Sequence, residues 1–178
     1  LKTAFLPSLN TAQAEHLSGE RLAGFILTTL NRLNYFTEKL SGGGQNYRYH
    51  PLFRNYLIRQ AKAFFSPGEL FALQMKTAQI LEDDGNVEDA ARLYGDAGEK
   101  QQLARIVIDY ARIFLAQGRN KTIAEWLAAI PRPMIEGNPW LLYWSGMCSF
   151  PSDMIHSRSC MQKSLAVFQI TNDPAGVY

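Results

Sequence analysis

The sequence predicts a mainly α-helical protein, in which a partial winged helix with a β-hairpin is followed by an antiparallel solenoid of tetratricopeptide-like helix pairs. Apolar residues recur at helical spacing along most of the chain. Two short runs rich in aromatic and β-branched residues flank the Gly-rich segment 41–45, a pattern typical of a β-hairpin. After residue 65 the periodicity is almost entirely helical, which indicates a second domain of stacked helices.

The composition is that of an ordinary globular protein. The chain has 178 residues, of which 47% are hydrophobic and 19% are charged. This apolar content is enough to bury one core or two small ones. A formal net charge of +2 supplies no large basic field, so the composition gives no sign of a nucleic-acid-binding surface.

The sequence also bears on location and metal binding. No apolar run approaches the ~20 residues that span a bilayer, and the N-terminus lacks the pattern of a signal peptide. Cys148 and Cys160 are too few for a disulfide scaffold, and with His156 they match no common metal-ligand spacing. We therefore expect a cytoplasmic protein with two free thiols, no metal site and no membrane partner. Because the chain begins with Leu1, we also expect it to be part of a longer protein.

The first predicted domain, residues 1–65, has the order helix, helix, hairpin, helix, which is that of a winged helix without its first element. A short helix over residues 11–17 precedes a longer one over 20–33, and strands over 34–40 and 47–50 form the hairpin. The second helix is expected to bury a face made of Leu22, Phe25, Ile26, Leu30 and Leu33.

A third helix is predicted to begin at Pro51, because proline has no N–H to lose in a first helical turn. It extends through residues 52–64 and closes the first domain. Its apolar face is expected to comprise Leu52, Phe53, Tyr56, Leu57, Ala61 and Phe64.

The second predicted domain, residues 66–178, begins with a capping box in which Ser66 is the N-cap and Glu69 lies three residues on. Its first helix is expected to bury Leu70, Leu73, Thr77, Ile80 and Leu81. Successive helices are expected to end at Gly85, Gly98 and Gly118. The interval from the first to the last of these glycines matches the about 33–34 residues of a tetratricopeptide-like helix pair. The domain therefore holds the first two to three helix pairs of a helical-repeat arm.

A last helix pair is predicted over residues 139–150 and 152–172. Its second helix is expected to bury Met154, Met161, Leu165 and Phe168. The aromatic residues of its first helix are Trp140, Tyr143 and Trp144. They could line a ligand-binding concavity, but we favour packing between helices, since aromatic side chains are the main core material here.

No residue pattern in the sequence supports catalysis. The Gly-rich segment 41–45 joins two strands and lacks the Gly-Lys-Ser/Thr of a phosphate loop, so this chain alone should not hydrolyse ATP. The acidic segment 82–84 is expected to be a solvated helix end. The histidines His16, His50 and His156 lie in unrelated surroundings. We therefore assign no catalytic residue and no enzymatic activity to this chain.

The segment 47–54, Tyr-Arg-Tyr-His-Pro-Leu-Phe-Arg, resembles the end of the winged-helix domain of MalT-like activators, which belong to the STAND class of signal-transduction ATPases. The order of several further pieces strengthens the resemblance. These pieces are residues 17–19, 30–36, 90–98, 126–131 and 165–168, followed by Asp173, Ala175 and Gly176 in an Asp-x-x-Gly turn.

The resemblance implies a modular parent protein. In such proteins a slow ATPase core precedes the winged helix, a helical arm that binds an inducer follows, and a C-terminal helix-turn-helix binds promoter DNA. The resemblance thus implies ATP and ADP as cofactors of the parent, and its own ATPase domain as a partner of this chain. The arm would bind a small-molecule inducer or a protein effector. This chain would couple that binding to the nucleotide state of the core.

The resemblance also implies one site residue. In related STAND ATPases a histidine between the wing and the last winged-helix helix faces the β-phosphate of ADP, and His50 stands at this position. An imidazole can donate to phosphate, and a neighbouring helix N-terminus favours anions. The Met-His-Asp pattern of the family is Tyr49-His50-Pro51 here, so the Asp is missing. The alternative is a structural histidine that is buried or caps the helix.

Two other functions also fit the sequence. A free-standing helical-repeat scaffold that binds a protein partner would have the same fold as a regulatory arm. A DNA-binding winged helix would use the basic residues Arg48, Arg54, Arg59 and Lys62. The helix over 20–33 offers only Arg21 and Arg32 beside an apolar face, which is unlike a helix that reads DNA.

Overall fold

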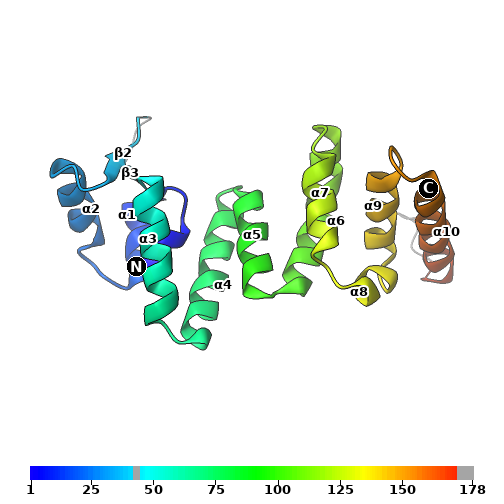
Figure 1. Ribbon diagram of the computed structural model, residues 1–178, viewed down its shortest axis with the longest axis horizontal. Helices are drawn as coiled ribbons and strands as arrows, with labels where there is room; N and C mark the ends of the chain where they lie inside the picture. Colours follow the sequence, from blue (N-terminus) through cyan, green and yellow to red (C-terminus); the bar gives the residue numbers. More distant parts are fainter. Residues whose placement is uncertain (42–44, 172–178) are drawn as a thin grey trace. The chain divides into compact units, whose positions relative to one another are not determined.

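The computed structural model describes residues 1–41 and 45–171, in two compact units, Leu1–Leu93 and Tyr94–Tyr178 (Figure 1). The first unit contains η1 (Lys2–Phe5), β1 (Leu9–Asn10), α1 (Thr11–Ser18), α2 (Ala23–Arg32), β2 (Thr37–Lys39), β3 (Asn46–Tyr49), α3 (Pro51–Phe64) and α4 (Pro67–Asp83). Helix α5 (Val87–Ala97) crosses the boundary, and the second unit continues with α6 (Lys100–Ala116), α7 (Asn120–Ala128), α8 (Arg132–Glu136), α9 (Pro139–Ser149) and α10 (Met154–Thr171). No helix among the described residues has the length and apolar character to cross a membrane. The fold is mainly helical with one small sheet, as the sequence predicts.

The wing of the first unit is an antiparallel sheet with the strand order β1-β3-β2. The β2–β3 hairpin confirms the predicted one and pairs Thr37 with Tyr49. The sequence did not predict strand β1, since two residues are too few to show the alternation of a strand. It pairs Leu9 with Tyr47 and gives the sheet its third strand. The predicted hairpin tip, residues 41–45, includes residues 42–44, which lie outside the described residues.

Helix α1 begins and ends where the sequence predicts. The Asn10 side chain accepts the Gln13 N–H at 2.8 Å, and the Gln13 side chain accepts the Asn10 N–H at 2.8 Å. Gly19, with φ of 74°, ends the helix in the left-handed region. A Cβ added to Gly24 would lie 2.9 Å from Thr11 Cγ2, so glycine at this position lets α2 approach α1 closely.

The direction predicted for the apolar face of the second helix is wrong. Helix α2 buries Ala23 and Leu27. The residues expected to be buried are instead exposed, namely Leu22, Phe25, Ile26 and Leu33, while Leu30 is half-buried. The small residues on one side of α2 permit the closest contact with the rest of the unit. The large apolar residues on its other side are therefore left outside.

The apolar face predicted for helix α3 is only partly buried. Ala61 is fully buried, and Phe53 and Leu57 are half-buried. The remaining predicted residues, Leu52, Tyr56 and Phe64, are exposed. Helix α3 packs against η1, and this element of four residues is too short to cover the whole face of a helix of 14 residues.

Helix α4 confirms both its predicted cap and its predicted face. Ser66 Oγ accepts the Glu69 N–H, and Glu69 Oε2 accepts the Ser66 N–H at 2.9 Å. Leu73, Thr77 and Leu81 are buried as expected. Leu70 and Ile80 are half-buried.

The three glycines expected to end helices do so with φ of 77° at Gly85, 81° at Gly98 and 74° at Gly118. In each case the residue after the glycine donates its N–H to a carbonyl in the last turn of the helix. These bonds run from Asn86 to Leu81, from Glu99 to Tyr94 and from Arg119 to Phe114. A side chain with a Cβ would be strained at these positions, so glycine determines where each helix stops.

The core of the second unit lies between α6, α7 and α9. Helix α6 packs against α7, both contact α9, and α9 lies side by side with α10 (Figure 1). The most deeply buried side chains include Leu103, Ile106, Val107, Ile123 and Leu141. The sequence did not predict helix α8. Pro131 follows the end of α7, and it is also the N-cap of this next short helix.

Helix α10 buries small residues where large ones were predicted. Its buried positions include Ser157, Cys160, Ser164 and Phe168, of which only Phe168 was expected. Met154 and Leu165 are exposed, so the prediction is wrong for them. A Cβ added to Gly146 of α9 would lie only 3.1 Å from the Ser157 carbonyl oxygen. Small residues on both helices permit this close approach.

The aromatic residues of α9 pack inside the second unit, which is the interpretation favoured from the sequence. The Trp140 ring centroid lies 5.0 Å from that of Phe168 and 6.1 Å from that of Trp144. Trp144 is buried, and its ring lies 4.8 Å from that of Tyr143. The contact between Trp140 and Phe168 holds α9 against α10, and the other two contacts lie within α9.

Candidate functional site at the junction of the wing and helix α3

His50 lies where the wing ends and helix α3 begins, and backbone hydrogen bonds hold it there. Its N–H donates to the Phe36 carbonyl at 2.7 Å, and its own carbonyl accepts the Arg54 N–H at 2.9 Å. Its φ of −53° and ψ of 136° turn the extended chain of β3 into the helix. The residue therefore joins the end of the sheet to the first turn of α3.

The His50 ring caps α3 with one nitrogen and leaves the other facing outward. Nδ1 accepts the Leu52 N–H at 3.3 Å. An accepting nitrogen carries no proton, so the neutral ring carries its proton at Nε2. The residue is exposed, and Nε2 has no hydrogen-bond partner in the described part of the chain. An N–H donor is thus presented beside a helix N-terminus, where unpaired backbone N–H groups and the helix dipole favour an anion.

An aromatic cluster supports the His50 ring. The Phe36 ring centroid lies 6.3 Å from that of His50, edge-on, and 5.6 Å from that of Phe53. Tyr49 completes the cluster at 5.9 Å from Phe53. Phe36 has a φ of 49°, a conformation that is uncommon outside glycine and that needs support from its surroundings. Sequence reasoning missed Phe36, because its aromatic character indicated only a strand.

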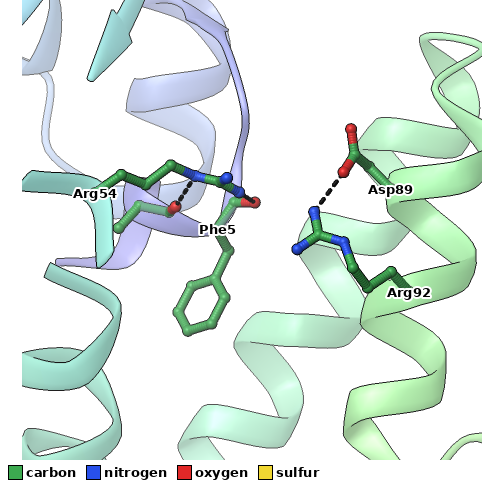
Figure 2. A network of polar contacts seen from close by, with 5 residues as sticks. Phe5, Arg54, Asp89 and Arg92 are labelled. Atoms are coloured by element: carbon green, nitrogen blue, oxygen red, sulfur yellow. Dashed lines mark hydrogen bonds and ion pairs between the residues drawn. The ribbon is translucent and has the colours of Figure 1, made fainter. Parts of the chain in front are cut away.

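Arg54, one turn after His50, holds the N-terminal segment against α3. Its Nε donates to the Ala4 carbonyl at 2.8 Å, and its Nη2 donates to the Phe5 carbonyl at 2.9 Å. Figure 2 shows this guanidinium group and, across from it on α5, the ion pair of Arg92 and Asp89. Burial lowers the pKa of Arg54, the charge of Arg92 lowers it further, and Asp89 opposes them. Arg54 therefore stabilises the first unit.

The basic residues considered for DNA binding do not form a common free surface. Arg48 pairs with Glu38 across the hairpin at 3.0 Å, and Arg54 is occupied by two carbonyls. Arg59 and Lys62 remain exposed on α3. Helix α2 presents an apolar outer face at the position where a winged helix reads DNA. These features do not favour direct DNA binding by this unit.

Tyr49 makes the stability of the first unit depend on pH. Its hydroxyl lies 2.8 Å from Thr3 Oγ1, and burial raises its pKa more than this bond lowers it. The folded state therefore keeps the proton at a pH where the unfolded state, with a pKa of about 10, has lost it. The stabilisation by Tyr49 is present below about pH 10 and is lost as the pH rises through the raised folded-state pKa.

We expect the free energy of unfolding of the chain to fall as the pH rises above about 10. The fall should be smaller in Tyr49→Phe, which cannot ionise. Urea denaturation at a series of pH values from about 8 to 11 measures both slopes. Tyr35→Phe, at an exposed tyrosine, is the control and should keep the slope of the original chain. Equal slopes in Tyr49→Phe and the original chain would contradict this prediction.

The other histidines and the two cysteines lie on other helices. His16 is an exposed residue of α1. On α10, His156 Nε2 lies 3.4 Å from Cys160 Sγ. Cys160 is buried, Cys148 is half-buried, and both are free thiols; burial raises the pKa of Cys148. Within residues 1–41 and 45–171, no group of three His, Cys, Asp or Glu side chains could hold a metal ion.

Polar contacts join α4, the first helix of the predicted arm, to α1. Lys76 Nζ donates to the His16 carbonyl at 2.6 Å, near the end of α1. At the other end of α1, Gln13 donates to the carboxylate of Asp84. The acidic segment 82–84 was predicted to be a solvated helix end. Asp84 is exposed, but it also links the end of α4 to α1. Both contacts lie within the first unit.

The first part of the chain is similar to a known family of domains. Residues 1–68 match the family model described as the MalT winged helix domain. The matched region contains the sheet, α1 to α3, and His50 at their junction. No solved structure matches the chain.

Proposed function

We propose that this chain, whose residues 1–68 form a winged helix domain of the MalT type, is a regulatory part of a signal-responsive ATPase that controls transcription. The following helices bind an inducer or a protein effector, in the manner of a tetratricopeptide-like arm. The winged helix couples that binding to the nucleotide state of an ATPase core in the parent protein. ATP and ADP are cofactors of the parent, and this chain contributes no catalytic residue.

The observation that carries the proposal is the geometry of His50. Its Nδ1 is occupied by the cap of α3, so the ring holds its Nε2–H outward in a defined direction. Phe36 restrains the ring from its edge. A donor held in this way, at a helix N-terminus, suits a phosphate oxygen. In the proposal this phosphate is the β-phosphate of ADP, bound by the core.

The contacts between α1 and α4 support the coupling step. Lys76 and Asp84 fasten α4 to the two ends of α1. Lys2 Nζ also donates to the Ser18 carbonyl at 3.1 Å, so the C-terminal end of α1 is bound by two lysines. Positive side chains stabilise this end of a helix. A force on α4 from bound effector would therefore act on the winged helix directly.

The test uses His50→Asn in the parent protein. Asparagine is a good N-cap and can accept the Leu52 N–H, but its shorter side chain keeps its amide N–H groups away from the position of the outward Nε2–H. We expect ADP to dissociate roughly tenfold faster, because one hydrogen bond to a charged phosphate is lost. Basal transcription activation should rise in parallel. Stopped-flow release of a fluorescent ADP analogue measures the rate.

Two controls separate the phosphate contact from the cap. His16→Asn changes an exposed histidine of α1 and should leave ADP release unchanged. His50→Ala removes both the cap and the donor, so it should release ADP as fast as His50→Asn and also lower the stability of α3. An ADP release rate in His50→Asn equal to that of the original parent would show that His50 only caps the helix.

A second candidate function is a free-standing scaffold that binds a protein partner. An apolar groove of about 800 Å³ at the end of the second unit favours it. Its lining includes Phe150, Met154, Ile155 and Met161. The sequence that precedes Leu1 in the parent protein distinguishes the two candidates. A phosphate-loop motif about two hundred residues upstream supports the regulatory ATPase, and its absence leaves the scaffold.

A further inference from the structure

A small polar cavity lies between helices α8, α9 and α10 of the second unit. Its volume is about 240 Å³. Cavities that enclose a drug-sized ligand have about 300–1,000 Å³, so this one suits a smaller group. The side chains that line it include those of Arg132, Glu136, His156, Cys160 and Lys163. A thiol, an imidazole and three charged groups thus share one cavity, which has no part in the proposed function.

The thiol of Cys160 has a base beside it. His156 precedes Cys160 by one turn of α10, and its Nε2 lies 3.4 Å from Cys160 Sγ. A neutral imidazole nitrogen can accept the proton of a thiol, and the thiolate that remains is the nucleophilic form of cysteine. His156 is exposed, so its ring can pass the proton on to water. Nucleophile and base are therefore adjacent before any ligand binds.

The cavity gives a ligand its route to the sulfur of Cys160. The residue is 6% exposed, and it lines the cavity. On another side α9 covers it, because a Cβ added to Gly146 would lie only 3.4 Å from Cys160 Cβ. A ligand that approaches the sulfur therefore meets the other side chains of the cavity, and these select which ligand reacts.

The charges of the cavity favour an anion. Arg132 Nε donates to the Glu136 carboxylate at 2.9 Å, so these two charges offset each other. Lys163 is exposed and has no ion pair in the described part of the chain. Its ammonium group gives the cavity a net positive charge, whose attraction for anions is screened by salt. A ligand with a carboxylate is thus favoured over a neutral one.

We propose that Cys160 is a modification site, at which a small disulfide that carries carboxylate groups forms a mixed disulfide with the protein. Lys163 attracts the carboxylate, and His156 takes the proton of the thiol. The sulfur of Cys160 then attacks the nearer sulfur of the ligand, whose own disulfide bond breaks. The far half leaves as a thiolate and accepts the proton by way of water. One thiol and one disulfide are consumed, and one of each is formed. The inference goes beyond the proposed function and does not depend on it.

The rate of disulfide exchange at each cysteine tests the site. Cys148→Ser leaves only Cys160, and Cys160→Ser leaves only Cys148. The probe is dithiobis(nitrobenzoate), a small disulfide with two carboxylates, at neutral pH, and the absorbance of the released thiolate measures the rate. We expect Cys160 to react roughly tenfold faster, because burial raises the pKa of Cys148 and leaves less of it as thiolate.

The unsubstituted chain provides a second measurement, which avoids any effect of serine on folding. Mass spectrometry of a sample that has reacted to one half should find the adduct on Cys160 and not on Cys148. Tryptophan fluorescence of the same sample checks that the second unit is still folded, because all three tryptophans lie in it.

Two variants separate the base from the charge. His156→Gln should slow the reaction of Cys160 roughly fivefold, both with the anionic probe and with dithiodipyridine, a neutral disulfide. Lys163→Gln should slow only the reaction with the anionic probe, by roughly threefold at low salt. Lys121→Gln makes the same change in charge on α7, at a side chain that is 92% exposed, and should leave both rates unchanged. His16→Gln, on α1, should also leave them unchanged.

A Cys160 that reacts no faster than Cys148 overturns the proposal. A fast Cys160 whose rate is unchanged in both His156→Gln and Lys163→Gln overturns it too, because the cavity then makes no contribution. A rate that does not rise with the concentration of the probe would show that the sulfur reacts only after α9 and α10 open, which also contradicts the proposal. These rates are independent of ADP release by the parent, so the proposed function stands or falls separately.

Discussion

Replacing Arg54 with alanine should lower the free energy of unfolding of the chain by about 3 kcal/mol. The change removes two hydrogen bonds from a charged donor, each with a contribution of about 1.5–3 kcal/mol. It also leaves the carbonyls of the buried residues Ala4 and Phe5 without this donor. Because Arg54 is partly exposed, water can replace some of the lost bonds, which keeps the loss below the sum of the two. Urea denaturation followed by far-UV circular dichroism measures it.

Arg59→Ala is the matched control for this prediction. Arg59 lies on the same helix and is exposed, so its removal should change the free energy of unfolding by no more than about 0.5 kcal/mol. The control also corrects for the change in net charge and in helix propensity. If Arg54→Ala and Arg59→Ala lose the same stability, the two carbonyl contacts of Arg54 do not stabilise the first unit.

Replacing Gly146 with valine should destabilise the second unit by about 3 kcal/mol, at the upper end of the usual effect of overpacking. A Cβ at this position would lie 3.0 Å from Met161 Cγ and 3.1 Å from the Ser157 carbonyl oxygen. The oxygen belongs to the backbone and cannot move aside, so α9 and α10 must separate. The three tryptophans of the chain, Trp126, Trp140 and Trp144, all lie in this unit. Tryptophan fluorescence during urea denaturation therefore reports its unfolding.

Gly95→Val is the control for the change at Gly146. Gly95 lies within a helix, does not have a positive φ, and has no atom within 4 Å of an added Cβ. Valine there has the same helix propensity as at position 146 but meets no neighbour, so a change within about 0.5 kcal/mol is expected. A Gly146→Val variant as stable as Gly95→Val would mean that α9 and α10 are not in close contact.

The sequence predicted the local structure well, because local signals depend on a few neighbouring residues. Ser66 with Glu69 and the glycine at position 85 act through their own backbone geometry, and each starts or ends a helix as expected. The hairpin followed from its aromatic strands. The family resemblance was confirmed for residues 1–68, where the motif around His50 is local as well.

The function of the candidate site stays a prediction, and its geometry followed from the sequence only in part. The resemblance singled out His50, and the structure shows that its ring caps α3 and leaves Nε2 outward. The sequence did not indicate that Phe36 would support this ring, nor that Arg54 would turn inward to the carbonyls of Ala4 and Phe5. These contacts join segments up to 50 residues apart, so no local pattern encodes them.

The sequence by itself determined the longer helices, the β2–β3 hairpin and the residues at which most of them end, whereas β1 and α8 were not predicted. Hydrogen bonds within a helix, caps and glycine turns are short-range interactions, and the residues that make them are adjacent in the chain. The buried face of α4 was predicted, but only the tertiary structure decided which faces of α2 and α10 are buried. Phe25 on α2 and Met154 on α10 are exposed, although both lie on faces that the sequence predicted to be buried. Gly24 and Gly146 allow the closest approach between helices, so close packing selects the side with small residues and leaves the larger apolar side outside.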